Sequence, residues 1–506
     1  MRHLIILSLL IISLITTSHS LYVKNEPKIS NETQECIDCH TAIHPGIVSS
    51  WEKSRHSKIT PAEAIKKEAL ERRVSFSSLE ERLKNVVVGC YECHSLNTEN
   101  HKDAFEHYGY KINVIVSPND CAVCHPVEAE QYSKNLMAFA HTNLVENKLY
   151  RDLMKSVNNP HTFEKGRIEI KGNNKLTEYE SCLYCHGTKI EVKGFETRET
   201  QLGEAIFPIL EGWPNQGVGR INPDGSRGSC SACHTRHEFS IEVARKPYTC
   251  AECHKGPDVP AFKVYEVSKH GNIFSSEYHK YNFDEVPWKI GKDFSVPTCA
   301  TCHVSLITSP DGKEVIAERT HQMNDRLSWR LFGVPYAQPH PIKPDLSDVK
   351  NSAGLPLIVE LTGEPVRQFV ISKDEQRKRN QTMKNICNNC HSVSWVNGHF
   401  ERLENTIKET NSLTLEATKI LTEFWKNGFA KGLPQNQNIF DEKIERVWTS
   451  IWLMYANSTR FASAMAGGGD YGVFADGRYQ LTEKLYEMSE MLEMKKKMKK
   501  SQSNKD

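Results

Sequence analysis

The sequence has no long apolar run after its first twenty residues, no surplus of either charge, and few apolar side chains. Hydrophobic residues make up 38% of the 506 residues, below the roughly 45–50% of an average soluble domain. A chain of this length would ordinarily form two or three domains, yet its supply of core-forming side chains is small. A bilayer span needs about 20 apolar residues, so we expect no membrane span in the mature protein.

Charge of one sign is also missing. Lys and Arg number 64, Asp and Glu number 63, and the formal net charge is +1. Proteins that bind nucleic acid usually carry a basic surplus. The balance therefore argues against nucleic acid as a partner.

The N-terminus has the pattern of an export signal. Arg2 precedes residues 4–15, which are apolar except for two serines, and small or polar residues follow up to Ser20. This order is typical of a secretory signal peptide, and the alternative is an uncleaved anchor. We predict cleavage near Ser20, removal of residues 1–20, and a periplasmic protein.

No cysteine lies outside one motif, C-x-x-C-H, which occurs eight times. In chain order the first to eighth motifs are Cys36-Cys39-His40, Cys90-Cys93-His94, Cys121-Cys124-His125, Cys182-Cys185-His186, Cys230-Cys233-His234, Cys250-Cys253-His254, Cys299-Cys302-His303 and Cys387-Cys390-His391. Two thiols at this spacing can add to the vinyl groups of one haem, and the adjacent histidine then binds the iron. The motifs predict eight covalently attached haems c.

Other chemistries fit the cysteines poorly. A single motif would also suit a zinc half-site or a redox dithiol. Eight copies, each followed by His and with no cysteine left over, disfavour both. Nothing about a disulfide requires the trailing histidine.

Twelve histidines remain outside the signal segment and the motifs, and a second axial ligand is expected to come from some of them. They are His44, His56, His101, His107, His141, His161, His237, His270, His279, His321, His340 and His399. His237 and His399 each follow their own motif closely. A ligand so placed would serve a neighbouring haem and join the haems into an electron-transfer chain.

The organisation predicted from the chain is a haem-binding domain at 21–400 and a helical region at 401–506 that ends in a Lys-rich tail. The motifs are unevenly spaced, so the chain is not a tandem array. We expect hairpins over 162–179 and 355–372 and an irregular loop over 212–228. The lysines at 495–500 predict a frayed, solvated end.

After the last motif, apolar residues take up a helical period. Leu403, Ile407, Ala417, Leu421 and Phe424 mark one face of a helix that ends at Gly428. Further helices are expected over 441–463, with Val447, Ile451, Met454 and Tyr455 inward, and over 481–498. They would cover the protein's own core or pack against another subunit. The fold class is mainly α, a multihaem cytochrome c fold wrapped on eight haems with long C-terminal helices.

The eight motifs, the stretch WPNQGVGRINPDGSRGSCSACHTRHEFS and the stretch CAECHKGPDVPAFKVYEVSKHG resemble the octahaem hydroxylamine oxidoreductase family over nearly the whole mature chain. The last five motifs and the helical end also resemble the pentahaem cytochrome c nitrite reductases. The resemblance implies a mainly helical homotrimer in which seven haems carry electrons and one haem reacts with small nitrogen compounds.

By this resemblance, the reactive haem is the one attached by Cys182 and Cys185, with His186 as its proximal ligand. The second ligands of the other haems would be His56, His141, His237, His270, His321 and His399. One of His44, His101 or His107 would complete the set, and we take His44.

The resemblance also suggests pocket residues. Relatives often carry an Asp-His pair after the sixth motif; here Asp258 is kept and Val259 replaces the histidine. Asp258 would move protons, with Tyr336 and His340 as helpers or as ordinary loop residues. In the oxidising enzymes a tyrosine from another subunit is bonded to the reactive haem. Tyr471 is the candidate here, unless Val473 or Phe474 takes that position and no bond exists.

The predicted function is multi-electron redox conversion of small nitrogen compounds, with a preference for reduction of nitrite to hydroxylamine or ammonia. Oxidation of hydroxylamine to nitric oxide or nitrite is the alternative, and a non-catalytic electron carrier is the second. A periplasmic or quinol-linked cytochrome would be the electron partner.

Overall fold

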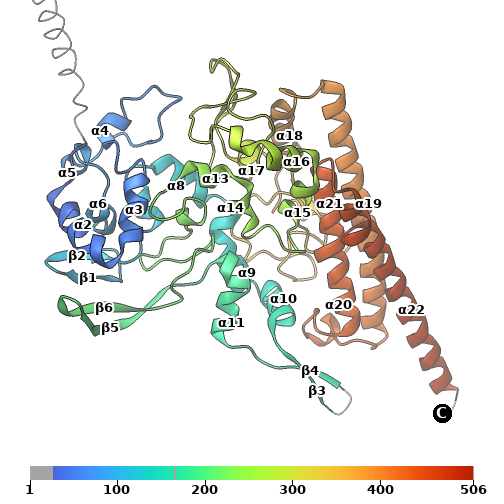
Figure 1. Ribbon diagram of the computed structural model, residues 1–506. Coiled ribbons are helices and arrows are strands. Elements are labelled where there is room, and N and C mark those ends of the chain that lie inside the picture. Colours follow the sequence, from blue (N-terminus) through green and yellow to red (C-terminus); the bar gives the residue numbers. More distant parts are fainter. Residues whose placement is uncertain (1–26, 165–166, 505–506) are drawn as a thin grey trace, which may run out of the picture.

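The computed structural model describes residues 27–164 and 167–504. The segment predicted as a signal, residues 1–20, lies outside the described residues. The N-terminal part of the chain (blue) lies on one side of the molecule and the C-terminal helices (orange and red) on the other, with the middle of the chain between them (Figure 1). Among the described residues no helix has the length and apolar character that a membrane crossing requires.

Short helices dominate the first third of the chain. Several begin at a proline, whose missing N–H costs nothing at a helix start. The elements are α2 Asn31–Ile43, α3 Pro45–Lys53, α4 Pro61–Ala64, α5 Glu81–Lys84, α6 Cys90–His94, β1 Ala104–His107, β2 Tyr110–Asn113, α7 Pro118–Cys121, α8 Pro126–Ser133, α9 Ala140–Val145 and α10 Lys148–Asn158.

The middle of the chain adds more short elements and the longest strand pair, β5 with β6. The elements are β3 His161–Glu164, β4 Arg167–Ile170, α11 Lys175–Glu180, α12 Cys182–His186, β5 Glu191–Thr200, β6 Gly203–Glu211, α13 Ile241–Arg245, α14 Pro247–Ala251, α15 Ala261–Val267, α16 Lys269–Glu277, β7 Trp288–Lys289, α17 Cys299–His303, β8 Ile307–Thr308, β9 Val315–Ala317, β10 Trp329–Arg330, β11 Gln338–Pro339 and α18 Lys373–Cys387. Single turns of 3-10 helix span Leu136–Phe139, Cys230–Ala232 and Tyr278–Lys280.

Both hairpin predictions need correction. β3 and β4 pair antiparallel, but they lie earlier than predicted. The side chain of Asn174 caps the start of α11. A helix therefore begins where the second strand was predicted. Over 355–372 only a turn forms, with Gly363 at φ +90° and single bridges in place of strands. The loop over 212–228 contains neither helix nor strand, as predicted.

The C-terminal part consists of long helices. α19 covers Val393–Lys426 and runs through the domain boundary predicted at residue 400. α20 Lys443–Ser450 continues through a π-helical turn, Ile451–Ala456, into α21 Asn457–Ala464, and α22 covers Arg478–Ser503. A 3-10 turn spans Leu433–Gln435 and a second π turn Tyr471–Ala475. The Lys-rich end is the last part of α22, so the prediction of a frayed tail is wrong; Lys499 donates a hydrogen bond to the Asn427 carbonyl (3.2 Å).

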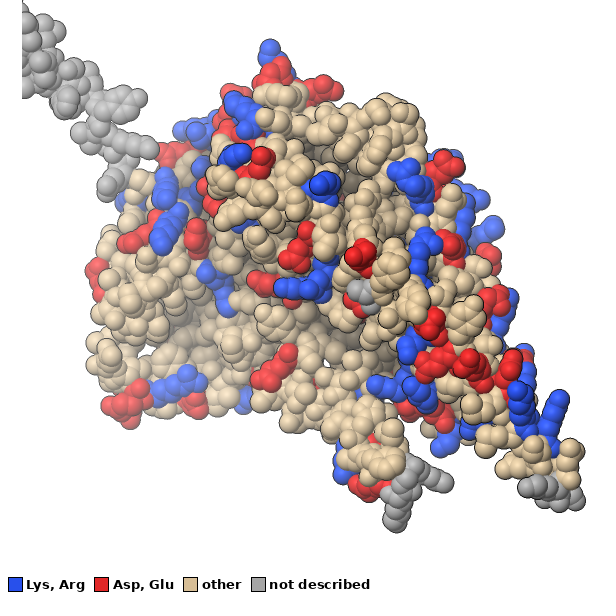
Figure 2. Space-filling model, turned by 45° about the vertical axis from the view of Figure 1, so that its right-hand side comes forward, with Lys and Arg blue, Asp and Glu red and all other residues tan. Residues whose placement is uncertain are grey.

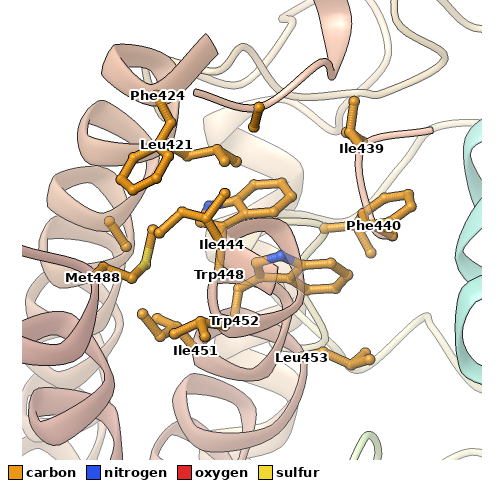
Figure 3. Close-up of a cluster of buried hydrophobic side chains, with 14 of the residues drawn as sticks. Leu421, Phe424, Ile439, Phe440, Ile444, Trp448, Ile451, Trp452, Leu453 and Met488 are labelled. Atoms are coloured by element: carbon orange, nitrogen blue, oxygen red, sulfur yellow. The ribbon is translucent and has the colours of Figure 1, made fainter. Parts of the chain in front are cut away.

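The largest apolar core lies between these helices (Figure 3). Leu421 and Phe424 of α19 meet Trp448, Ile451 and Met488, all at most 2% exposed. The five residues predicted on the inner face of α19 are all buried. Of the predicted inner residues of the next helix, Val447 and Ile451 are fully buried, and Met454 and Tyr455 are partly buried.

Buried apolar clusters are concentrated in the second half of the chain. Apart from Leu149, every buried member of the four clusters found among the described residues lies between residues 265 and 488. A large cavity, lined by residues between 53 and 466, lies where further side-chain core would otherwise be expected. The surface mixes acidic and basic side chains without a field of one sign on the face shown (Figure 2), in keeping with the balanced net charge.

Candidate functional site

The C-x-x-C-H motifs lie on short helices or at helix ends. The second, fourth and seventh motifs are themselves the helices α6, α12 and α17, the first lies inside α2, and the eighth begins at the last residue of α18. In a helix, residues three and four apart share a face. Both thiols and the histidine of a motif therefore point to the same side. The sixteen cysteines all lie in the described chain and form no disulfide.

A single cavity of about 2020 Å³, called the chamber below, joins most of the motifs. It is lined by cysteines or histidines of every motif except the first. Its volume is at least twice that of an ordinary small-molecule pocket of about 300–1,000 Å³. The chamber thus takes the place of a large side-chain core between the motifs, and large apolar cofactors fit it.

The motifs are ordered differently in space and in sequence. Thiols of three pairs of motifs lie close together. The third and fifth motifs meet at Cys121 and Cys230, the fourth and sixth at Cys185 and Cys253, and the sixth and seventh at Cys250 and Cys299. Weaker electrostatic interactions link four further pairs of motifs: the first and second (Cys36 with Cys90), the second and third (Cys93 with Cys124), the fifth and sixth (Cys233 with Cys250), and the seventh and eighth (Cys302 with Cys387). The fourth motif is a branch from the sixth.

Histidine pairs have the spacing that a shared metal requires. Two imidazoles bound to one ion through bonds of about 2 Å place their ring centres about 6 Å apart. Four motif histidines have such a partner: His40 with His107 (6.2 Å), His125 with His56 (6.3 Å), His234 with His321 (6.4 Å) and His391 with His270 (6.0 Å).

The other predicted second ligands also lie near motif histidines. His237 is an electrostatic neighbour of His94. His141 is an electrostatic neighbour of His186, which belongs to the haem predicted to be reactive, so this contact does not identify the haem that His141 would serve. His399 lines the chamber. Its ring stacks on Trp395 (5.5 Å between centres), which in turn stacks on His391 (4.3 Å).

Several candidate ligand histidines are in the state that iron ligation needs. Burial lowers the pKa of five of them to about 4: His56, His234, His237, His303 and His321. They are therefore neutral near pH 7, and a neutral imidazole can bind a metal. In His141 and His186 the Nδ1 atoms face the carbonyl oxygens of Gly187 (2.7 Å) and Ala140 (3.1 Å), respectively, which leaves each Nε2 free to ligate.

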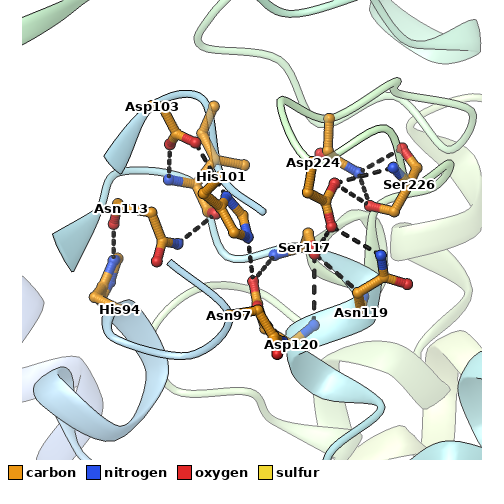
Figure 4. A network of polar contacts seen from close by, with 12 residues as sticks. His94, Asn97, His101, Asp103, Asn113, Ser117, Asn119, Asp120, Asp224 and Ser226 are labelled. Carbon is orange, nitrogen blue, oxygen red and sulfur yellow. Dashed lines mark hydrogen bonds and ion pairs between the residues drawn. The ribbon is translucent and has the colours of Figure 1, made fainter. Parts of the chain in front are cut away.

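The three candidates for the seventh second ligand differ in their surroundings. His101 is buried with Nδ1 3.0 Å from Asp103 and Nε2 3.1 Å from Asp120, so neither nitrogen is free (Figure 4). The Nδ1 of His44 lies 2.9 Å from the Nδ1 of His40 on the same face of α2, so these rings are joined by their outer nitrogens. His107 alone stands at the two-ligand spacing from His40.

The predicted pocket residues are only partly brought together. Asp258 lines the chamber beside Val259, and its charge acts on Cys182, Cys185 and His186. His340 also lines the chamber, and burial lowers its pKa to about 3. Tyr336 does not line it. Its hydroxyl lies 2.9 Å from both the Leu361 carbonyl and the Thr418 hydroxyl and shares its one proton between them, which holds the loop after β10 to α19.

Tyr471 lies in the π turn that precedes α22. Its ring is half-buried against its own chain; burial, together with the neighbouring Asp476, raises its pKa to about 12. Val473 and Phe474, the alternative positions, are 41% and 58% exposed.

One residue at the chamber was missed from the sequence. Arg330 lines the chamber, and its charge acts on both His186 and His340. A single arginine in a loop sequence carries no signal of its own. Only its place in the fold distinguishes it.

Comparison with known proteins supports this view of the site. A family model described as "seven times multi-haem cytochrome CxxCH" matches residues 222–331 and 364–438, and one for cytochrome c554 and c-prime matches residues 120–205. A solved structure titled "Hypothetical multiheme protein" is 41% identical, has a TM-score of 0.87 and is aligned over 94% of this chain and 98% of its own. The chain belongs to the multihaem cytochromes c.

Two more distant relatives agree with this assignment. The cytochrome is 23% identical over 432 residues to a probable nitrite reductase-hydroxylamine oxidoreductase fusion protein of Kuenenia stuttgartiensis. The match includes 83% of this chain but only 40% of that relative's length. A reducing HAO-like protein complex of the same organism shares the fold, at 18% identity and a TM-score of 0.63 over 94% of this chain and 87% of its own.

Proposed function

We propose that the cytochrome carries eight haems and reduces nitrite to hydroxylamine or ammonia at the haem held by Cys182, Cys185 and His186. The observation that carries the proposal is the place of the fourth motif: it branches from the sixth motif, and Asp258 acts on both its cysteines and its histidine. A branch position suits a terminal site to which the other haems deliver electrons. Oxidation of hydroxylamine to nitric oxide or nitrite is the alternative reaction.

The second ligands proposed for the other seven haems are His56, His107, His141, His237, His270, His321 and His399. His107 replaces His44 because of its spacing from His40. The role proposed for His44 is to accept the Nδ1 proton of His40, which would hold that ring in place.

The chain's own groups would bind the substrate and move protons. When bound, haem iron supplies a coordination position and conducts electrons. An oxygen atom of the Asp258 carboxyl would take up a proton from solvent and release it toward the substrate. His340, neutral at pH 7, would donate a hydrogen bond from its ring N–H, because an imidazolium is not available at that pH.

Two features favour reduction. The first is Val259, which stands where relatives often carry a titratable histidine next to the aspartate. The second is Tyr471, which is packed against Asp476 of its own chain. A phenol held by its own chain would have to leave that contact to bond to another subunit's haem, which disfavours the cross-link typical of the oxidising relatives.

We also propose that the mature cytochrome is periplasmic, forms a homotrimer, and receives electrons from a small periplasmic or a quinol-linked cytochrome. The long α19 and α22 give a surface for such an assembly. The exposed Tyr486, Met494 and Met498 on α22 support it.

The test is ligand binding to the purified holoprotein. Intact mass should show eight haems, and carbon monoxide or nitrite should perturb one of them. Reduced viologen with nitrite should then yield hydroxylamine or ammonium. Eight unperturbed haems would favour the non-catalytic carrier, whereas turnover of hydroxylamine without nitrite reduction would favour the oxidative alternative.

A further inference from the structure

Arg330 is a partly buried cation whose side chain makes no hydrogen bond or ion pair within the described chain. It ends β10, opposite Gln338 of β11. Its Nη1 is buried without a hydrogen-bond acceptor, and its guanidinium lies 5.7 Å from the ring centre of Phe332. A buried guanidinium nitrogen without an acceptor is costly, and an acceptor from outside the chain would remove that cost.

The loop after Arg330 is held firmly. Arg460 donates to the Leu331 carbonyl (3.3 Å), and the Gly333 amide donates to the Asn457 side chain (3.3 Å). Asn457 also donates to the Asp258 carbonyl (3.1 Å). Because Asn457 and Arg460 are fully buried on α21, one rigid helix positions both the Arg330 loop and the Asp258 loop.

Apart from the exposed Arg55, the other arginines of the chamber have acceptors. Arg326 donates to the carbonyls of Thr301 (3.3 Å), Cys302 (3.1 Å) and Ser305 (3.2 Å). Arg319 pairs with Glu128 at 2.7 Å. Arg73 also has a buried Nη1 without an acceptor, but its other nitrogen donates to the Asp284 carbonyl. Arg330 is thus poised to bind something that the chain itself does not supply.

We propose that Arg330 binds a planar two-oxygen anion in the chamber, beside the fourth motif. A guanidinium presents parallel N–H donors that match such an anion in two hydrogen bonds. Two sources share this chemistry: nitrite, and a propionate of the protein's own haem. The nitrite source rests on the proposed function; the propionate source does not.

The experiment compares holoprotein variants Arg330→Gln and Arg330→Lys with Arg319→Gln, a chamber arginine that already has an acid partner. Two quantities are measured in each: the nitrite dissociation constant, from the optical change of the ligand-binding haem, and the midpoint potentials of the haems. Intact mass checks that all haems are attached.

If nitrite is the anion, Arg330→Gln weakens nitrite binding about 10–100-fold, the worth of a charge-assisted hydrogen bond, and leaves the potentials unchanged. If a propionate is the anion, the potential of one haem falls in Arg330→Gln and nitrite affinity is kept. Arg330→Lys should retain the charge but lose the paired geometry, and give a smaller change in the same quantity.

The proposal is overturned if Arg330→Gln, with its full set of haems, matches the wild type and Arg319→Gln in both measurements. Should Arg330→Gln fail to mature, an Arg330→Lys protein identical to the wild type in both quantities overturns it equally. A wild-type protein that binds no nitrite would refute the proposed function, while the midpoint potentials would still decide the role of Arg330.

Discussion

Single residues decide which histidines are free to bind iron. In the sequence alone, His101 is as good a candidate ligand as His44 or His107. In the fold both of its nitrogens are used by Asp103 and Asp120, in a pocket from which water is excluded. His101 is therefore part of the structure and not of the electron path.

The His101 contacts predict a pH-dependent stability. Burial by itself would lower the pKa of His101, but the bonds to Asp103 and Asp120 outweigh it and raise the pKa from 6.5 to about 10. A raised pKa stabilises the fold fully below pH 6.5, and this stabilisation is lost as the pH rises toward 10. Replacing His101 by Asn should cost about 3–5 kcal/mol at pH 6, because two buried carboxylates lose their cation.

Denaturant unfolding of both proteins between pH 6 and 10 measures this effect. The difference between wild type and His101→Asn should shrink as the pH rises. A difference that is constant over the whole range would mean that His101 is neutral in the folded protein.

Asp258 offers a second prediction at the residue scale. Asp258→Asn removes the proton-carrying group and should lower nitrite turnover about 10²–10⁴-fold, with nitrite affinity largely kept. Glu252→Gln is the control, since Glu252 also lines the chamber near Cys185. Equal losses in both variants would show that the charge of the chamber matters and that the position of Asp258 does not.

At the scale of elements, α19 combines an apolar face with a line of threonines. Thr410, Thr414 and Thr418 each donate to the carbonyl four residues earlier, at 2.8 Å. Their oxygens then accept from buried donors of other elements: Arg460 at Thr410, and Trp448 at Thr418. The helix thereby satisfies polar groups that would otherwise be buried without partners.

Leu421→Ala tests the haem-free core around α19. Leu421 is 0% exposed among Trp448, Ile451 and Met488, and the cavity left by truncation should cost about 2–5 kcal/mol. The helical circular dichroism should melt at lower temperature in this variant. Lys419→Ala, on the exposed face of the same helix, should change stability by no more than about 0.5 kcal/mol; equal shifts for the two variants would contradict the assigned core.

The whole molecule is organised by the chamber. Residues far apart in sequence line it, and side-chain clusters form mainly beyond residue 264. A chain with 38% hydrophobic residues can fold in this way because cofactors take the place of a large apolar core. Attachment of the haems and folding are expected to depend on each other.

Haem-stained denaturing electrophoresis of the boiled protein tests the assembly. A single band at monomer size is expected, because Tyr471 packs on its own chain and no covalent bond should join the subunits. Intact size measured without denaturant should still correspond to a trimer. A haem-stained ladder up to trimer size would instead point to a bond at Tyr471 and to hydroxylamine oxidation.

Local chemistry could be predicted from the sequence because it depends on residues close together in the chain. The spacing of Cys182, Cys185 and His186 already implies a shared helical face, and the period of Leu403 and Ile407 implies a buried one. The strand pair β5 with β6 was missed, since its residues alternate weakly between exposed and partly buried positions. The hairpin near residue 170 was displaced because Asn174 caps a helix.

By itself, the sequence determined the covalent haem chemistry, the family, and the face of α19 that is buried. Only the tertiary structure decided that the fourth motif branches from the sixth, that His107 and not His101 stands opposite His40, and that Arg330 lacks a partner. The physical reason is distance. Ligation, electron transfer and charge compensation act across a few ångströms of space, and residues brought that close by folding can lie hundreds of positions apart in the chain.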